Sequence, residues 1–208
     1  MENSAELITK AASRFYHETK ADPNSRYRSW EHCYKSFHDA RRQASPDPDY
    51  LSLQLAFYLA SWGMYRGSSF LLQKDYKVHV PVVEEILKKE YDCLLGLSCM
   101  DLRKQEVQDA LASIETFLEN YFDALRREVR QDVKNKVSTT LITKTLLGTF
   151  GCVPAYDRYF VEGVKDQKVA VGTYGMKSLL QLADFYERNE VIKVRERYAE
   201  IYTLHKAT

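Results

Sequence analysis

The stretch that decides the fold runs from residue 50 to residue 64 and reads YLSLQLAFYLASWGM. Leucine, alanine and aromatic residues occupy every side of the helix that this stretch would form. A helix without a polar face is expected inside a protein. The stretch contains Ser and Gln and is too short to span a membrane. We therefore predict a central apolar helix over about residues 50–64.

The rest of the chain also has a helical period. Apolar residues recur three and four positions apart in most segments, which is typical of amphipathic helices. The segment ASPDPD at 44–49 is a linker, because its two prolines end one helix and start the next. Eight glycines and five prolines leave few turns. We predict an all-α fold, a single domain over 1–208 in which about seven to nine helices form an irregular bundle around the 50–64 helix.

Charge and cysteine content narrow the class of protein. Lysine plus arginine number 30 and aspartate plus glutamate 29, so the formal net charge is +1. This balance does not favour nucleic acid as a partner, although a local basic patch stays open. The N-terminal stretch lacks a signal-peptide core, no segment resembles a membrane span, and the four cysteines show no CxxC pair. We predict a cytoplasmic protein with no membrane partner.

Motifs for cofactors and metals are missing from the sequence. His32 and His38 are six residues apart, which is the wrong spacing for two zinc ligands on one helix. No phosphate loop, serine hydrolase or kinase signature occurs. We predict no metal and no cofactor, and the sequence leaves open whether the protein is an enzyme.

A long helix is predicted over about residues 102–134. Its apolar positions alternate four and three residues apart, beginning with Val107, Leu111, Ile114 and Leu118. Such a stripe packs inside a bundle or joins two subunits, so the helix could mediate a homo-oligomer.

A glycine-marked corner follows the central helix, in ASWGMYRGSS at 60–69. Trp62 and Tyr65 could line a pocket there, with Arg66 binding a phosphate or carboxylate. The alternative is a kinked core helix whose Arg66 pairs with a nearby acid.

A second corner lies in TKTLLGTFGCVPAYDRYF at 143–160. Its two glycines permit a tight turn, and Pro154 favours the first turn of a new helix, where Asp157 would interact with free backbone amides. The corner is thus either a structural turn or part of a site. The side chains that we predict to bind a ligand here are Lys144, Tyr156 and Arg158.

The basic and aromatic stretch RYRSWEHCYKSFHDARR at 26–42 is a third candidate. Its composition is found in helices that bind nucleic acid. Glu31 and Asp39 interrupt the basic face, however, and the aromatic residues also fit the core stripe of an amphipathic helix.

The second corner resembles a segment of helix-hairpin-helix proteins related to DNA glycosylases, over about residues 144–160. The matching residues are Lys144, Pro154, Asp157, Arg158, Tyr159 and Phe160. The resemblance implies that Asp157 is a catalytic acidic group that assists removal of a damaged base. The glycine-containing hairpin of that family is missing upstream, where this chain reads NKVSTTL. As a whole, the chain resembles uncharacterised bacterial all-α proteins, a similarity that implies no activity.

These observations lead to two main hypotheses. In the first, the protein binds a small anionic ligand or a protein partner at the two corners, which together form one surface. In the second, it is a nucleic-acid-linked helical enzyme in which Asp157 is catalytic and Lys144, Arg158 and Arg66 steer phosphates. A third hypothesis is an interaction protein that assembles through the 102–134 helix.

Overall fold

The computed structural model describes residues 4–129 and 136–188. Within these ranges every regular element is a helix and none is a strand, so the all-α prediction is confirmed. The helices, with their bounds, are α1 (Ser4–Ala21), α2 (Arg28–Ala40), α3 (Pro48–Ser61), α4 (Val80–Ile86), α5 (Gln105–Val129), α6 (Thr139–Thr149), α7 (Arg158–Asp166) and α8 (Met176–Arg188). Four short 3-10 helices join them: η1 (Phe70–Gln73), η2 (Tyr76–His79), η3 (Lys89–Leu94) and η4 (Asp101–Arg103).

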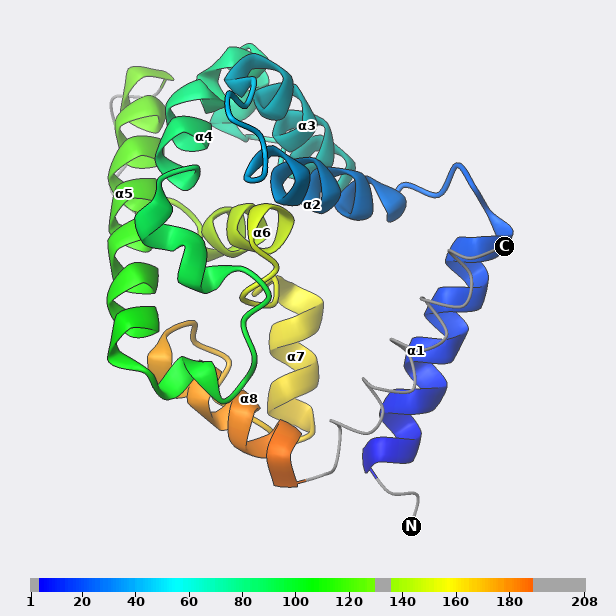
Figure 1. The fold of residues 1–208 in the computed structure, drawn as a ribbon. Coiled ribbons are helices and arrows are strands. Elements are labelled where there is room, and N and C mark those ends of the chain that lie inside the picture. Colours follow the sequence, from blue (N-terminus) through cyan, green and yellow to red (C-terminus); the bar gives the residue numbers. More distant parts are fainter. Residues whose placement is uncertain (1–3, 130–135, 189–208) are drawn as a thin grey trace.

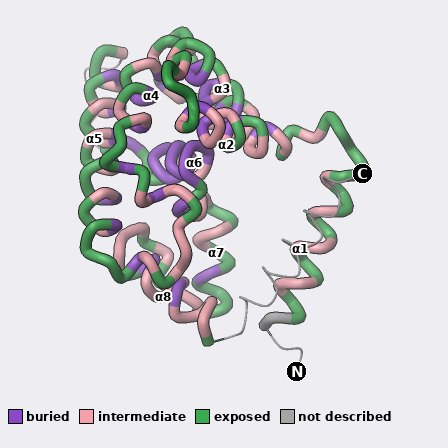
Figure 2. Tube along the Cα trace, viewed as in Figure 1, coloured by how far each residue is buried: buried purple, intermediate pink, exposed green. Residues whose placement is uncertain are grey.

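The helices form an irregular bundle in which α6 lies between the others. Figure 1 shows α2, α3 and α4 at one end, α5 along one side, and α7 and α8 at the other end. Helix α6 contacts α2, α3 and α5. All residues from 141 to 146 are buried, and Figure 2 shows this concentration of buried residues in α6. The centre of the bundle is therefore α6 together with the inner face of α3.

Local sequence explains where α3 and α6 begin. The Asp47 side chain accepts hydrogen bonds from the amides of Asp49 and Tyr50, and Pro48 occupies the first turn of α3. Ser138 caps α6 by accepting a hydrogen bond from the Leu141 amide. These caps hold the two helices in the register that builds the site.

Helix α3 has apolar residues on all sides, but only some of them are buried. Leu51, Leu55, Tyr58 and Leu59 are buried in the core. Tyr50, Leu53 and Phe57, which lie three and four positions apart, are 50%, 47% and 59% exposed. The expectation that apolar residues on all sides of α3 are buried is therefore wrong for this stripe, because neighbouring helices cover only the opposite face.

Helix α5 begins slightly later than the predicted 102–134 helix, and the last part of that prediction lies outside the described residues. It begins at Gln105 and ends at Val129, after the separate turn η4, and residues 130–135 lie outside the described ranges. Its apolar stripe is buried by this chain's own helices, at Val107, Leu111, Ile114, Leu118, Phe122 and Leu125. The uncovered apolar face required by assembly through this helix is not present on the described part of α5. Homo-oligomerisation itself stays a prediction.

The two ends of the chain complete the description. Helix α1 lies apart from the bundle in Figure 1, and an edge-to-face ring contact joins Phe15 to Tyr27. The predicted last helix, from about residue 191 onward, and part of the predicted 1–208 domain lie outside the described residues. Among residues 4–129 and 136–188, no helix combines the length and apolarity that crossing a membrane requires.

Candidate functional site

The crossing of α3 and α6 depends on two pairs of residues. Tyr58 lies in the last turn of α3, and Trp62, four residues later, caps its C-terminal end. Lys144 and Gly148 are one turn apart on α6. The Tyr58 ring lies against Gly148, where a Cβ atom would come within 2.5 Å of Tyr58 Cε1. Only glycine allows this approach. The contact fixes the register that brings Lys144 to the C-terminal end of α3.

Lys144 is a cation buried at this crossing. Its side chain is only 7% exposed, and Nζ donates a hydrogen bond to the backbone carbonyl of Trp62 at 2.8 Å. Nζ also lies 3.6 Å from Oδ2 of Asp157 and 5.8 Å from the centroid of the Trp62 ring. The two glycine-marked corners thus meet in space, and Lys144 is the residue that joins them.

Several neighbouring groups shift the pKa of Lys144 in opposite directions. Burial lowers its pKa most strongly, Asp157 raises the pKa, and the positive charges of Arg66 and Arg26 lower it further. Arg26 and Arg66 therefore act on the same amine from outside the crossing. We call the group formed by Arg26, Trp62, Arg66, Lys144 and Asp157 the Lys144 corner.

Asp157 has two structural contacts. Its Oδ1 accepts a hydrogen bond from the Phe160 amide at 3.1 Å and caps α7, while Oδ2 faces Lys144. The carboxylate does lie at a helix start, but α7 begins at Arg158, so Pro154 lies in the preceding loop rather than in its first turn. Asp157 holds α7 against α6, and a catalytic role for it stays a prediction.

Arg66 and Arg26 are exposed cations at this corner. Within the described residues, neither guanidinium forms an ion pair. Arg26 lies 4.9 Å from the centroid of the Tyr27 ring, and Tyr27 contacts Trp62 edge to face. Arg66 folds back on Gly63, where a Cβ atom would be 3.1 Å from its Cζ, and the φ of +79° at Gly63 favours glycine as well. The sequence alternative in which Arg66 pairs with a local acid is therefore not what the structure contains.

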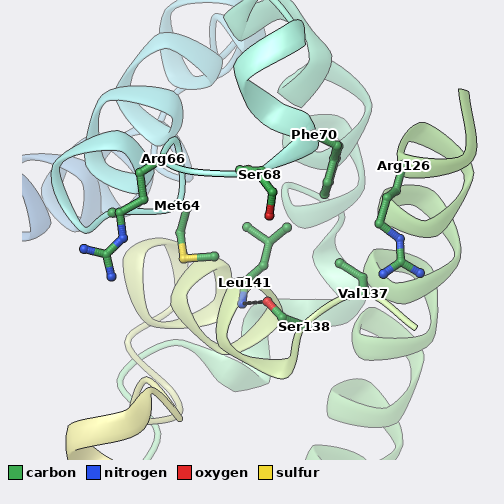
Figure 3. Close-up of a pocket in the computed structure, with 10 residues that line it drawn as sticks. Met64, Arg66, Ser68, Phe70, Arg126, Val137, Ser138 and Leu141 are labelled. Atoms are coloured by element: carbon green, nitrogen blue, oxygen red, sulfur yellow. Dashed lines mark hydrogen bonds between the residues drawn. The ribbon is translucent and has the colours of Figure 1, made fainter. Parts of the chain in front are cut away.

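A hollow of about 400 Å³ lies beside the corner, between residues 63–70 and the start of α6. Figure 3 shows Ser68 and Leu141 pointing toward its centre, while the guanidinium groups of Arg66 and Arg126 point away from the Ser68 hydroxyl. Met64 and Phe70 also line it. The hollow is therefore lined by both apolar and polar side chains, and the two arginines belong to its rim.

Three of the predicted ligand-binding residues have other contacts. The Tyr65 hydroxyl lies 2.7 Å from Nε2 of the buried His79. The Tyr156 hydroxyl donates to Ser178 at 2.8 Å. Arg158 is exposed, and its Nε lies 3.8 Å from Glu162 on the same helix. The structure therefore brings together Trp62, Arg66, Lys144 and Asp157, but not these three.

Sequence reasoning missed two features of the corner. The first is Tyr58, whose only sequence signal is Gly148, a glycine inside a helix. The second is a pair of buried polar atoms, the Tyr58 hydroxyl and the Trp62 Nε1, which have no hydrogen-bond partner among the described residues. Buried donors are normally satisfied by protein, water or ligand, so these atoms mark a place where a further group can bind.

Metal-ligating side chains are not gathered here. Within the described ranges, no three His, Cys, Asp or Glu residues are grouped as metal ligands would be. Cys33 and Cys152 are buried thiols, and burial raises the pKa of both. The corner therefore offers cations and N–H donors, which are groups that bind anions.

Comparisons with known proteins give no relative: no family model, curated protein or solved structure matches this chain. The fold and the site define a broad class, an all-α protein with a cationic corner at a helix crossing. The resemblance to helix-hairpin-helix proteins and to bacterial all-α proteins stays a prediction.

Proposed function

We propose that this protein binds a small anionic ligand at the Lys144 corner. The observation that carries the proposal is the charge imbalance around one buried amine. Arg66 packs on Gly63 next to Trp62, and Arg26 lies over Tyr27, whose ring contacts Trp62. Among the described residues, Asp157 is the one carboxylate within ion-pair distance of Lys144. Charge of one sign collected at a partly buried site attracts a ligand of the opposite sign.

Hydrogen-bonding groups at the corner support the same class of ligand. Trp62 Nε1 and the Tyr58 hydroxyl are buried and have no partner among the described residues. Two guanidinium groups that form no ion pair among the described residues can bind a phosphate or carboxylate through charge-assisted hydrogen bonds.

We also propose a cytoplasmic location for the protein, because the buried thiols of Cys33 and Cys152 suit a reducing compartment.

The test is a titration with inorganic phosphate followed by two-dimensional NMR. The chain has two tryptophans, so its indole N–H signals are few and can be assigned with Trp62→Phe. We expect phosphate to shift the Trp62 indole signal. Arg66→Gln should weaken phosphate binding about tenfold, the effect of losing one charge-assisted hydrogen bond.

The matched control is Arg127→Gln, which removes an exposed arginine from α5. It should leave phosphate affinity unchanged. A silent Trp62 signal, or equal affinity in the Arg66→Gln and wild-type proteins, would show that the corner does not bind anions.

A nucleic-acid-linked enzyme is the second candidate, and the observation that supports it is the approach of Lys144, Asp157 and Arg66. The test is incubation with duplex and single-stranded DNA containing an abasic site or a uracil. We expect base release or strand cleavage that disappears in Asp157→Asn and binding that falls steeply with salt. Activity that persists in Asp157→Asn would rule out the catalytic role of Asp157.

A further inference from the structure

A second hollow lies on the other side of α2, between its C-terminal half and the residues that follow η3. Its volume is about 380 Å³, a size that suits a small ligand. The residues that line it are Tyr34, His38, Arg41, Arg42, Asp92, Leu95 and Gly96. We call it the Arg41 hollow.

Arg41 is a rigid, buried cation in this hollow. Its side chain is 6% exposed, and its guanidinium lies 4.8 Å from the centroid of the buried Phe150 ring. One terminal nitrogen donates to the Ile86 carbonyl, and the other lies 2.6 Å from Oδ1 of Asp92. Its buried Nε has no acceptor among the described residues. A guanidinium held in this way is preorganised to bind an oxyanion such as a carboxylate or a phosphate.

Asp92 is the exchangeable member of the pair. Its side chain is 54% exposed, and Arg41 is the one side-chain partner of its carboxylate within the described residues. Within residues 4–129 and 136–188, no backbone amide donates to this carboxylate, in contrast to a carboxylate that caps a helix. Because an exposed side chain can rotate into solvent at little cost, a ligand anion can take its place on Arg41.

Aromatic rings form the wall next to this cation. Trp30 and Tyr34 are stacked with centroids 5.8 Å apart, and Tyr34 and His38 are stacked at 6.2 Å. The exposed Arg42 lies 3.4 Å from Nε2 of His38 and has no acidic partner among the described residues. At Gly96 a Cβ atom would meet nothing within 4 Å, so this side of the hollow is open. A flat ring fits the wall, and a negative group fits the two arginines.

We propose that the Arg41 hollow binds a planar ring that carries a phosphate or carboxylate, in the manner of a nucleoside monophosphate. The anion replaces Asp92 on Arg41 and contacts Arg42, while the ring lies against Tyr34 and His38. This site is separate from the Lys144 corner and does not depend on the function proposed there. It gives a role to the basic and aromatic stretch at 26–42.

The experiment measures binding of AMP to the full chain by calorimetry and by the NMR signal of the Trp30 indole. Inorganic phosphate and adenosine are titrated separately. We expect AMP to bind at least fivefold more tightly than either part, because ring and anion are both held. Asp92→Asn should tighten AMP binding about five- to tenfold, since the competing charge is removed while the side chain keeps its size.

Other variants test whether the Arg41–Asp92 pair opens to bind a ligand or only stabilises the fold. Arg42→Gln should weaken AMP binding several-fold, and the matched control Asp166→Asn, an exposed aspartate of α7, should leave it unchanged. Arg66→Gln should also leave it unchanged, because Arg66 belongs to the other site. The proposal is overturned if AMP fails to bind both the wild type and Asp92→Asn, if Asp92→Asn does not tighten binding, or if phosphate alone shifts the Trp30 indole signal of Arg66→Gln with the same affinity as AMP.

Discussion

Two buried cations in this molecule have almost the same surroundings. Lys144 and Arg41 each donate to a backbone carbonyl, each lie near an aromatic ring, and each have one carboxylate partner. Their side chains are 7% and 6% exposed. The difference lies in the acids. Asp157 is 28% exposed and is tied to the Phe160 amide, whereas Asp92 is 54% exposed and is not tied to a backbone amide.

This difference separates a pair that holds the fold together from a pair that can open. Asp157 cannot leave Lys144 without giving up the cap of α7, so an anion at the Lys144 corner must bind beside Asp157 and use Arg26 and Arg66. Asp92 can leave Arg41 and expose a ready-made guanidinium. The same kind of ion pair thus serves two purposes. Which purpose it serves depends on whether a backbone amide also holds the carboxylate in place.

The largest effect on stability should come from Lys144→Met. The variant leaves the Trp62 carbonyl without its donor and Asp157 without its cation, which should lower the free energy of unfolding by about 2–4 kcal/mol. Urea unfolding followed by circular dichroism measures this loss. Lys177→Met, an exposed lysine on α8, is the control and should cost less than about 0.5 kcal/mol. Equal effects of the two variants would contradict the structural role of Lys144.

The next effect should come from Gly148→Ala. The new methyl group would meet the Tyr58 ring at 2.5 Å, so we expect a loss of about 1–3 kcal/mol, even though alanine favours helix. Gly163→Ala is the matched control, because Gly163 lies in α7 with nothing within 4 Å of its Cβ position. That control should gain up to about 1 kcal/mol. Stabilisation by both substitutions would show that the crossing is looser than described.

The comparison of the two acids can be tested directly with Asp157→Ala and Asp92→Ala. Asp157→Ala removes a helix cap and an ion pair and should cost about 1–2 kcal/mol. Asp92→Ala removes an exposed carboxylate whose place beside buried Arg41 water can take, and it should cost less than Asp157→Ala, about 1 kcal/mol or less. Both are measured as shifts of the urea midpoint. A larger loss in Asp92→Ala would mean that Asp92 is not exchangeable, and it would weaken the case for the Arg41 hollow.

The smallest effect concerns His79, a buried side chain with no acidic partner among the described residues. Burial lowers the pKa of His79 to about 4. An unfolded histidine takes up a proton near pH 6.5, so the stability contributed by neutral His79 is complete above that pH and is lost as pH falls toward 4. Between pH 7 and pH 5.5 this loss should be about 1 kcal/mol.

Urea unfolding at both pH values measures the effect of His79. The variant His79→Phe should reduce the pH dependence by that amount, and His17→Gln, at an exposed position, should not. An unchanged pH dependence in His79→Phe would place the titrating group elsewhere.

Much of the helical fold could be predicted from the sequence because the signals are local. The Asp47–Pro48 start of α3 and the Ser138 cap of α6 are encoded within a few residues. Burial was harder to predict, because the apolar stripe of Tyr50, Leu53 and Phe57 has the same composition as the buried face of α3. Only the positions of neighbouring helices decide which face is covered.

The candidate site, too, could be predicted only in part from the sequence. Trp62, Arg66, Lys144 and Asp157 were predicted, since each lies at a helix end or beside a glycine-marked corner. Tyr65, Tyr156 and Arg158 come from the same corners, but their side chains point to His79, Ser178 and Glu162. The pairing of Arg41 with Asp92 joins residues 51 positions apart, and nothing local indicates it.

The central place of α6 also has a consequence for how the chain folds. Its contacts are distant in sequence: Lys144 bonds to a residue 82 positions earlier, and Trp30 donates to the Leu147 carbonyl 117 positions later. During synthesis, α2, α3, α4 and α5 emerge before the helix that fills the space between them. We therefore expect their inner faces to stay exposed until about residue 150 has left the ribosome, and folding to be slower than in a bundle closed by sequence neighbours.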